Sequence, residues 1–489
     1  MLVDALLDAR RRCPHTLAVS DGSRTLTYTR LTALAAVLRE VVSRKTQCER
    51  VGIVLPSSTA FPAVVFGVLW AGKIAIPLNF LLRTDELTRI IEDAQIDCIL
   101  TVRHFHELAA TLPVHAVYLE ELSLKRRMIF AAFKRRPSAP TVHSGDTAVI
   151  LYTSGTTAEP KGVELTYGNL HRNCVDSIFS LDMDPKQTFL NILPPFHVFG
   201  LTANVLVPVF LGASVYAIPR FNPLAAARMT ADKGVTVILA IPSMYAAILR
   251  TKSAKPDAFR SIYLAISGGE PLPDSVRIGF AERFGVTLRQ GYGLTETSPV
   301  VCACSASVYR EGTVGKAIRN VQIRIVGGDG NDLPAGRDGE ILIRGPGVMK
   351  GYYRKPEETR RVIDAQGWFS TGDIGRLDAD GFLSITGRAK EMLIIGGENV
   401  FPREIESVLE MHESVLQAAV IGVPDGLRGE VPVAFVIPQK DAAVTADELR
   451  NFARRSLAGF KTPKRIEIRD DLPTGPTGKI LKRKLREML

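Results

Sequence analysis

Cysteine is scarce in this sequence. Six cysteines are spread over 489 residues, and their spacing forms none of the paired frameworks of a small secreted domain. Cys302 and Cys304 stand two positions apart, but no histidine or further cysteine lies near them to complete a metal site. We therefore expect reduced thiols in a cytoplasmic protein, and neither a disulfide scaffold nor a structural metal.

One long run without charge occurs, at residues 198–219. It is long enough to span a bilayer, but Pro208 and Gly212 interrupt it, and residues 213–218 are typical of a strand. We predict a buried helix followed by a buried parallel strand instead of a membrane span. The first twelve residues already carry two aspartates and three arginines, so we expect no signal peptide there.

The charge of the chain is basic but dispersed. Lysine and arginine exceed aspartate and glutamate by ten, yet they cluster only at 125–136 and 479–486, and no nucleic-acid motif accompanies them. We expect no nucleic-acid partner and a modest preference for polyanionic ligands. The apolar content of 46% and charged content of 23% are ordinary for a soluble globular enzyme. The length allows about two to four domains.

Strand-like and helix-like segments alternate in the first part of the chain. This alternation is typical of a parallel sheet with helices on both faces, and it recurs between 236 and 267, which predicts a second such sheet. The first segments are strands at 50–55, 74–78 and 98–102 and helices at 60–70 and 84–94.

The sequence pattern changes at about residue 312, where short strands and Gly-rich turns predict a small antiparallel, barrel-like unit. A compact α+β module follows, with helices at 402–412 and 446–457 and strands at 418–423, 433–438 and 465–468. The predicted fold class is α/β. A large N-terminal domain, residues 1–386, holds two βαβ-type sheets and the barrel-like unit, and a small α+β C-terminal domain, residues 387–489, follows.

A β-type run at 148–152 leads into small and hydroxylated residues that Pro160, Lys161 and Gly162 close. Backbone N–H groups converge on an anion where side chains are small, and hydroxyls and a lysine add donors. We predict a phosphate cradle, although most such stretches are flexible linkers. The Gly-x4-Gly-Lys-[Ser/Thr] spacing of the P-loop is absent. The residues expected at the phosphates are Thr153, Ser154, Gly155, Thr156, Thr157 and Lys161.

Five further motifs complete the pattern. They are LPPFHVFG at 193–200, SGGEPL at 267–272, RQGYGLTET at 289–297, STGD at 370–373 with GRAKE at 387–391, and PTGPTGK at 473–479. With the phosphate loop, and in this order, they resemble the adenylate-forming enzymes: acyl-CoA synthetases, luciferases and peptide-synthetase adenylation domains. The resemblance covers essentially the whole chain and is closest to fatty acyl-CoA synthetases. It implies ATP and CoA as substrates and Mg²⁺ as the metal.

The resemblance implies a nucleotide site built from these motifs, each of which alone would be an ordinary turn after a strand. Adenine lies against small residues, and Gln290 matches the position that hydrogen-bonds its amino group. Thr295 reaches a phosphate, and Glu296 supplies the hard oxygen that Mg²⁺ on ATP requires. Asp373 accepts the ribose hydroxyls with help from Arg388. The implied nucleotide-binding residues are Gly268, Gly269, Glu270, Gln290, Gly291, Tyr292, Gly293, Asp373 and Arg388.

The C-terminal domain is mobile by the same resemblance and swings about Lys390. In the first step Lys479 reaches the acyl carboxylate and the α-phosphate, where a cation offsets the approach of two negative groups. In the second step Gly396 and Gly397 line the tunnel through which the CoA thiol arrives. One active site thereby performs adenylation and thioester formation in turn, and it excludes water from the reactive adenylate.

His197 stands in an apolar stretch, where a lone histidine is more often a core residue. The family places the matching histidine at the acyl carboxylate, so we expect His197 to orient the substrate. Residues 194–199 contain no Asp or Lys to hold the ammonium group of an amino acid. The expected pocket is apolar, which favours a fatty acid. Its residues are Val198, Leu201, Ala240, Ile241, Met244, Leu294, Val300 and Val301.

Three other functions stay open. The acyl group could pass to the phosphopantetheine of an acyl carrier protein, although no insertion typical of fatty acyl-AMP ligases lies between Gly372 and Glu406. A non-catalytic nucleotide or acyl-lipid sensor should have lost Lys479, Glu296 or the phosphate loop, and none is lost. A luciferase-like oxygenase shares the adenylation residues.

The segment 124–136 places basic residues on both sides of an apolar centre. It is either an exposed helix or a weak peripheral contact with an anionic membrane. A homodimer is also left open.

Overall fold

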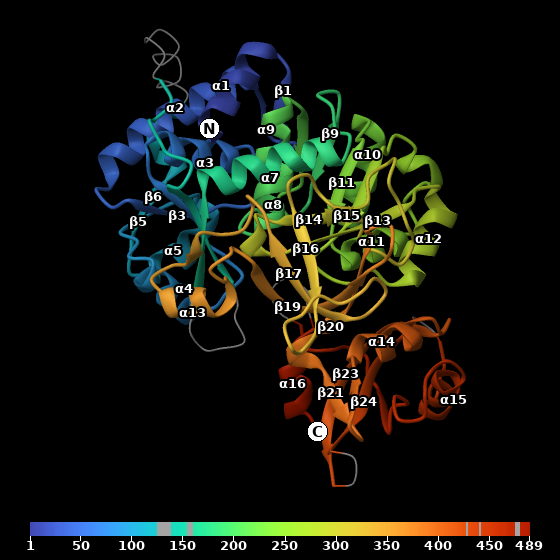
Figure 1. Ribbon diagram of the computed structural model, residues 1–489. Helices are drawn as coiled ribbons and strands as arrows, with labels where there is room; N and C mark the ends of the chain where they lie inside the picture. Colours follow the sequence, from blue (N-terminus) through green and yellow to red (C-terminus); the bar gives the residue numbers. More distant parts are fainter. Residues whose placement is uncertain (125–137, 154–159, 427–428, 440–441, 475–479) are drawn as a thin grey trace.

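The computed structural model describes residues 1–489 except 125–137, 154–159, 427–428, 440–441 and 475–479. In Figure 1 a large N-terminal domain lies above a smaller C-terminal domain, drawn in orange and red. The large domain holds two large sheets and a four-stranded sheet. The α/β fold class is therefore confirmed.

The first large sheet has seven strands in the order β18-β8-β7-β4-β3-β5-β6. Strands β7, β4, β3, β5 and β6 run parallel, and β8 and β18 extend the sheet with antiparallel pairings. The three strands predicted before residue 102 are confirmed as β3, β4 and β5. The bounds are β3 Arg50–Val54, β4 Ile74–Pro77, β5 Cys98–Thr101, β6 His115–Tyr118, β7 Thr147–Thr153, β8 Lys161–Thr166 and β18 Gly351–Tyr352.

The second large sheet has nine strands in the order β15-β14-β13-β12-β11-β9-β10-β1-β2. Its strands from β13 to β1 are parallel, as predicted for residues 236–267, and antiparallel strands close both edges. The bounds are β1 Leu17–Ser20, β2 Thr25–Thr27, β9 Thr188–Asn191, β10 Ser214–Ala217, β11 Val237–Ala240, β12 Leu264–Ser267, β13 Leu288–Gly293, β14 Val300–Ala303 and β15 Lys316–Ala317.

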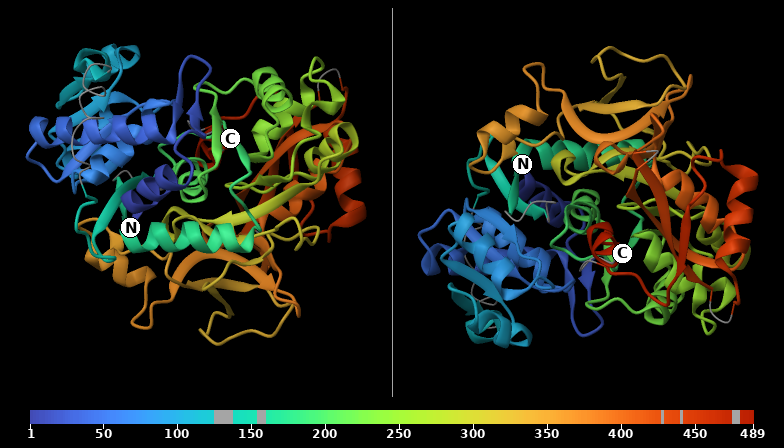
Figure 2. Two further views of the ribbon diagram at one scale, coloured as in Figure 1. Left: turned by 90° about the horizontal axis from the view of Figure 1, so that it is seen from above. Right: turned by 90° about the horizontal axis from the view of Figure 1, so that it is seen from below.

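Helices cover both faces of each large sheet. One apolar cluster joins the inner faces of the two sheets to α1, α2, α3, α7 and α9, which lie between them. A second cluster places α10, α11 and α12 on the outer face of the nine-stranded sheet, and another places α4 and α5 on that of the seven-stranded sheet. In Figures 1 and 2 the teal helix α7 runs from the blue side of this domain toward its green side.

The helices of the large domain have the following bounds: α1 Leu2–Arg12, α2 Tyr28–Lys45, α3 Ala60–Trp70, α4 Thr84–Asp93, α5 His106–Ala110, α7 Tyr167–Ser180, α8 Val198–Leu201, α9 Val207–Leu211, α10 Pro223–Lys233, α11 Pro242–Arg250, α12 Asp274–Phe284 and α13 Pro356–Val362. Short one-turn helices are η1 Arg103–Phe105, η2 Leu119–Leu122, η4 Pro256–Phe259, η5 Thr295–Thr297 and η6 Ala389–Glu391.

The uncharged run folds as predicted, into a buried helix and a buried strand. The helix is continuous through α8, a π-helical segment η3 (Thr202–Leu206) and α9. Gly212 ends it in the left-handed conformation, with φ of +79°, and β10 follows in parallel between β1 and β9. Within the described residues, no helix combines the length and the apolar character needed to cross a membrane.

Local signals explain where helices start and stop. The side chain of Asn222 accepts a hydrogen bond from the backbone N–H of Ala225 at 2.9 Å, Pro223 occupies the first turn of α10, and Gly234 ends that helix with φ of +60°. The threonines before α7 and α15, Thr166 and Thr445, form capping boxes in the same way.

The barrel-like unit is a four-stranded antiparallel sheet in the order β16-β17-β19-β20. Its apolar face packs against β14 of the nine-stranded sheet through one shared cluster that includes Val301, Ile341 and Leu383. The bounds are β16 Gln322–Val326, β17 Gly339–Arg344, β19 Phe369–Leu377 and β20 Leu383–Arg388.

The described residues of the small domain form five strands and three α-helices, so its predicted α+β class is confirmed. Strands β23 and β24 are longer than predicted, because their hairpin pairing continues past Pro424 and Pro432, where the sequence pattern breaks. The bounds are β21 Leu393–Ile395, β22 Glu398–Val400, α14 Pro402–Glu410, β23 Val415–Asp425, β24 Gly429–Pro438, α15 Ala446–Ser456, β25 Arg465–Ile468 and α16 Lys482–Glu487.

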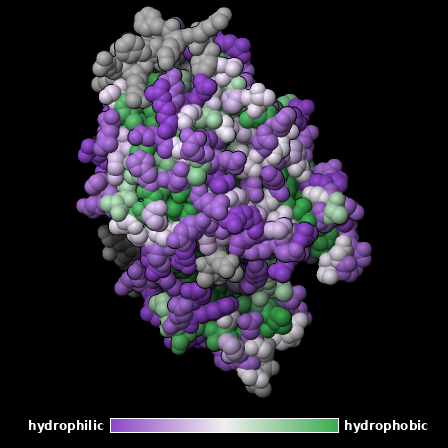
Figure 3. Space-filling view, turned by 90° about the vertical axis from the view of Figure 1, so that its left-hand side faces the viewer, coloured by the Kyte–Doolittle hydropathy of each residue, from purple (hydrophilic) through white to green (hydrophobic). Residues whose placement is uncertain are grey.

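The surface that Figure 3 shows is mostly hydrophilic, and its apolar residues lie in separate patches. All six cysteines are free thiols, and four of them are buried.

Tyr245 offers a test of the packing between β11, β12 and α11. Its side chain is fully buried, and its hydroxyl lies 2.9 Å from the carbonyl oxygen of Ile238 and 3.1 Å from that of Ile266. We expect Tyr245→Phe to lower the free energy of unfolding by about 1–2 kcal/mol, because the hydroxyl bond is lost without a change of shape. Urea unfolding followed by circular dichroism measures the change.

Tyr263→Phe is the matched control. Its hydroxyl also bonds a carbonyl oxygen, that of Asp182 at 3.2 Å, but the side chain is 38% exposed and water replaces the bond. Equal losses of unfolding free energy in the two variants would contradict a stabilising buried hydrogen bond at Tyr245.

Candidate active site

Three strands bring a carboxylate, a phenol and a guanidinium together. Asp373 on β19 and Arg388 on β20 are direct partners in the antiparallel ladder, and Tyr292 reaches them from β13. The Tyr292 hydroxyl donates to Oδ2 of Asp373 at 2.7 Å, and Nε of Arg388 donates to Oδ1 at 2.8 Å. Asp373 is only 4% exposed. Both of its oxygens are thus held in a fixed orientation.

The charges in this trio reinforce one another. Burial raises the pKa of Tyr292 well above its usual value, and the Asp373 carboxylate raises it further, so the phenol stays a neutral donor. Burial alone would lower the pKa of Arg388, but the charge of Asp373, its hydrogen bond and the charge of Glu391 together outweigh burial, and the pKa is raised.

Glu296 lies in η5, the turn directly after β13. The hydroxyl of Tyr352 donates to Glu296 Oε1 at 3.0 Å, and the backbone oxygen of Glu296 accepts from Met349 N–H at 2.8 Å. Thr297 stabilises the turn, because its hydroxyl oxygen accepts from the N–H of Leu294 at 2.9 Å. Burial and the Glu296 charge raise the pKa of Tyr352, so this phenol also stays neutral.

The first and last residues of the predicted phosphate cradle lie on two paired strands, β7 and β8. Thr153, the last residue of β7, pairs with Lys161, the first residue of β8. Lys161 forms an ion pair with Glu358 of α13, and its ammonium lies 5.6 Å from the centre of the Tyr352 ring. The cradle residues Ser154, Gly155, Thr156 and Thr157 lie outside the described residues.

Glycines allow close packing at the ends of β12 and β13. A side chain at Gly268 would come within 3.3 Å of the Phe199 ring, and one at Gly293 would come within 1.9 Å of the Pro299 carbonyl oxygen. Gly269 has φ of +84°. The Gln290 side-chain oxygen accepts from Leu272 N–H at 3.3 Å. The structure thus brings the predicted adenine residues to one place.

His197 directly precedes α8, and its ring centre lies 5.1 Å from that of Phe196. Its Nε2 is buried and has no hydrogen-bond partner among the residues described. Burial lowers the pKa of His197 to about 4, so the imidazole is neutral at physiological pH. A neutral ring nitrogen without a partner is available to a polar group of a substrate.

Most of the predicted acyl-pocket residues meet in one apolar cluster, the one between the two large sheets. Two members lie elsewhere: the side chain of Ala240 packs in the cluster beneath α10 to α12, and that of Val301 packs with the four-stranded sheet. The Ala240 carbonyl still accepts from Gly268 N–H at 3.1 Å. The residues in the shared cluster are Val198, Leu201, Ile241, Met244, Leu294 and Val300.

Comparison with known proteins agrees with this geometry. The family model for AMP-binding enzymes matches residues 7–353, and that for the AMP-binding enzyme C-terminal domain matches residues 404–479. The chain belongs to the AMP-binding enzymes. The adenylate-forming resemblance is therefore confirmed.

Relatives with assigned activities cover nearly the whole chain. A feruloyl-CoA synthase of Amycolatopsis is 35% identical over 97% of this chain and 96% of its own length. A long-chain-fatty-acid–CoA ligase of Escherichia coli is 32% identical over 93% and 88%. The crystal structure of ATP-bound MatB from Rhodopseudomonas palustris is 31% identical, with a TM-score of 0.91 over 100% of this chain and 98% of that one. This AMP-binding enzyme is an AMP-forming acid–thiol ligase.

The predicted hinge and thiol-tunnel residues of the ligase lie at the start of its small domain. Lys390 is exposed in η6. Gly396 and Gly397, with φ of +60° and +88°, form the two-residue turn between β21 and β22. Such a turn requires positive φ at both positions, so the hairpin alone explains both glycines. Lys479 lies outside the described residues.

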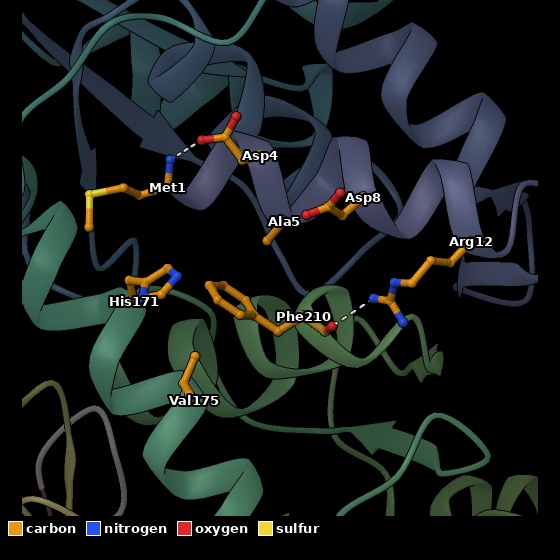
Figure 4. Close-up of a pocket in the computed structure, with 8 residues that line it drawn as sticks. All are labelled: Met1, Asp4, Ala5, Asp8, Arg12, His171, Val175 and Phe210. Carbon is orange, nitrogen blue, oxygen red and sulfur yellow. Dashed lines mark hydrogen bonds and ion pairs between the residues drawn. The ribbon is translucent and has the colours of Figure 1, made fainter.

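A separate pocket of about 230 Å³ lies between α1, α7 and α9, and Figure 4 shows its lining. Arg12 crosses its edge and donates to the carbonyl oxygen of Phe210 at 2.8 Å. None of the predicted active-site residues lines it: the lining is Met1, Asp4, Ala5, Asp8, Arg12, His171, Val175 and Phe210. We therefore do not assign it to the active site.

Sequence reasoning missed Tyr352 and Glu358. Tyr352 holds the Glu296 carboxylate, and Glu358 binds the cradle lysine, Lys161. Both residues follow β17 in the sequence: Tyr352 ends β18, and Glu358 lies in α13. They reach the site only because β18 pairs with β8. No local pattern predicts that pairing.

Asp373→Asn tests the carboxylate at the centre of the trio. We expect the KM for ATP to rise about 10- to 100-fold, because the hydrogen bonds of a charged acceptor are lost. Pyrophosphate release at varied ATP concentration measures it. Asp338→Asn is the control, since Asp338 is exposed and pairs with Arg376 of the same strand as Asp373. A similar rise in both variants would refute a specific nucleotide role.

His197 predicts a pH dependence of stability. Its pKa of about 4 lies below the value of about 6.5 for an unfolded histidine, so the unfolded chain binds the proton first as the pH falls. The stability that neutral His197 preserves is complete above about pH 6.5 and is lost toward pH 4.

We expect His197→Gln to flatten the decline of unfolding free energy between pH 7 and pH 4 by up to about 3 kcal/mol. Urea unfolding across that range measures it. His104→Gln, at an exposed position, should leave the decline unchanged. An identical decline in His197→Gln and the native protein would show that the imidazole is not held neutral.

Proposed function

We propose that this ligase activates a fatty acid, or an acid with a comparably apolar body, as acyl-AMP and transfers the acyl group to CoA. The observation that carries the proposal is the position of His197. Its unpartnered neutral nitrogen stands at the start of a helical run without charge, and the residues beside it share one apolar cluster. A carboxylate is the polar end of an acid that such surroundings accept.

The relatives support a CoA acceptor but differ in their acids. One is named a feruloyl-CoA synthase and the other a long-chain-fatty-acid–CoA ligase. The apolar lining favours an acid without a second charge, because an unpaired charge buried there would be costly.

We infer that ATP is held by the Asp373 trio and the cradle. Asp373 would accept the ribose hydroxyls, and Tyr292 and Arg388 fix the orientation of its carboxylate. Adenine would lie on Gly268 and Gly269 near Gln290. Lys161 and Thr153 flank the loop that would bind the phosphates.

Glu296 is the residue that would hold Mg²⁺. Tyr352 occupies one of its carboxylate oxygens, which leaves the other for a metal. The described residues contain no group of three metal-ligating side chains, and Mg²⁺ commonly binds through one or two carboxylates together with substrate phosphates and water. The residues thus fit the ion, which when bound would neutralise phosphate charge.

The reaction proceeds in two balanced steps. A carboxylate oxygen of the acid attacks the α-phosphorus, the bond to the β-phosphate breaks, and pyrophosphate leaves. The CoA sulfur then attacks the acyl carbon, AMP leaves with the bond electrons, and the thiol proton is released. His197 orients the carboxylate in the first step, while the apolar cluster excludes water from the mixed anhydride.

Rotation of the small domain about Lys390 would exchange Lys479 for the Gly396–Gly397 turn between the steps. The first residue of α16 is anchored near this hinge, because Lys482 lies 2.9 Å from Glu391 and 2.8 Å from Glu406. Lys479 stands three residues before Lys482 in the sequence.

Membrane contact through 124–136 and a homodimer stay predictions. Residues 125–137 lie outside the described part of the chain.

The first experiment is pyrophosphate release from ATP across carboxylic acids of increasing chain length, with and without CoA. We expect release with an apolar acid, and an acyl-CoA thioester only when CoA is present. Release without a thioester would identify a carrier protein as the acceptor. No release with any acid would refute the proposal.

Lys479→Ala separates the two steps within the same assay. We expect pyrophosphate release to fall about 100-fold or more, since a cation at the reacting oxygens is removed, while thioester formation from supplied acyl-AMP persists. Lys484→Ala, at an exposed position of α16, should preserve both. Equal loss of both steps in Lys479→Ala would contradict the division of labour.

A further inference from the structure

Helix α7 carries a row of polar side chains along one face. They follow one another at intervals of four, three and four residues, which places them on the same side of an α-helix. Each forms a hydrogen bond with a loop that is distant in the sequence, so the helix joins separate parts of the large domain. The residues of the row are Asn169, Asn173, Asp176 and Ser180.

Asn173 is the member of this row that binds the turn of Glu296. Its amide nitrogen donates to the carbonyl oxygens of Thr297, at 3.2 Å, and of Val300, at 2.8 Å. Its amide oxygen accepts from the N–H of Val300 at 3.3 Å. Asn173 is only 2% exposed. The whole amide is therefore used to hold the residues that directly follow Glu296.

The loop that leads into β18 binds the same turn. The N–H of Met349 donates to the Glu296 carbonyl oxygen at 2.8 Å. A side chain at Gly347 would come within 2.8 Å of the Thr297 carbonyl oxygen and 3.1 Å of the Asn173 amide nitrogen. The glycine thus leaves the space that the hydrogen bond from Asn173 to Thr297 needs.

The same helix is continuous with the strand that ends the phosphate cradle. β8 begins at Lys161, and α7 follows β8 directly, with Thr166 as its N-cap. β8 also pairs with β18, whose Tyr352 hydroxyl binds the Glu296 carboxylate. One segment of chain therefore carries the cradle lysine at its start and, through Asn173, holds the turn of Glu296.

We propose that Asn173 is a positioning residue that fixes the turn of Glu296 relative to the strand of Lys161 and thereby sets the affinity of the site for ATP with Mg²⁺. Its hydrogen bonds are with backbone groups, so it acts through Glu296. A side chain of this length must donate two hydrogen bonds and accept one, which the amide of asparagine does and a carboxylate does not. This inference rests on the proposed function, in which Glu296 holds Mg²⁺.

Binding of ATP in the absence of any acid tests the proposal. Isothermal titration calorimetry gives one Kd for ATP with excess Mg²⁺ and another for ATP with EDTA. The second Kd divided by the first measures what the metal contributes to binding. This ratio does not depend on the fraction of enzyme that is folded, so a less stable variant can still be compared.

We expect Asn173→Ala to weaken binding of ATP with Mg²⁺ about tenfold and to change binding with EDTA less than about twofold, because only the support of the metal ligand is lost. Asn173→Asp, which keeps the size of the side chain and loses both donors, should lower the ratio as well. Asn320→Ala is the matched control, since Asn320 donates to Asp176 of the same helix at 2.9 Å and not to the turn of Glu296. Its ratio should stay within about twofold of the native one.

Glu296→Gln provides the reference, because it removes the charge of the proposed metal ligand. Asn173→Ala added to Glu296→Gln should lower the ratio no further, since the amide acts through Glu296. A further loss in the double variant would overturn the inference, and so would a native ratio in Asn173→Ala. An unchanged ratio in Glu296→Gln itself would instead refute the metal-binding role proposed for Glu296, so the two failures are distinguishable.

Discussion

The carboxylate of Asp373 is the group on which the rest of the site depends. Tyr292 comes from the nine-stranded sheet and Asp373 from the four-stranded sheet, so the hydrogen bond between them joins the two sheets at a single buried point, and Arg388 of the four-stranded sheet binds the other carboxylate oxygen. A buried carboxylate without such partners would be unstable as an anion. With them both carboxylate oxygens are paired and the group is held in one orientation. Gln290 and the Glu296 turn lie within a few residues of Tyr292, so the same point positions them as well.

The surroundings of His197 differ from those of Asp373. Here the surroundings are apolar, and burial keeps His197 neutral instead of pairing it with a charge. The helical run after His197 lies in the core between the two large sheets. Under the proposed function, a ligase of this design would separate its polar chemistry, at the sheet ends, from the apolar recognition of its substrate in the helix layer.

The sequence predicted much of this arrangement. The alternating pattern identified β3, β4 and β5 and the parallel centre of the second sheet, because buried strands and their helices carry local signals. The motifs identified Asp373, Arg388, Tyr292 and Glu296, which the structure brings into two connected groups. Residues whose roles depend on distant pairing could not be found in this way. Tyr352, for example, acts through the pairing of β18 with β8.

The ion pair between Lys161 and Glu358 changes how phosphate binding should be understood. If Lys161 binds the nucleotide as its motif predicts, the phosphate must first replace Glu358, so binding is an exchange of one anion for another. Lys355 lies 3.6 Å from the other oxygen of Glu358, and it can keep that carboxylate paired after the exchange. The affinity for ATP then reflects the difference in free energy between two ion pairs of the same lysine. A substitution of Lys355 would therefore change the affinity for the phosphates without any direct contact with them.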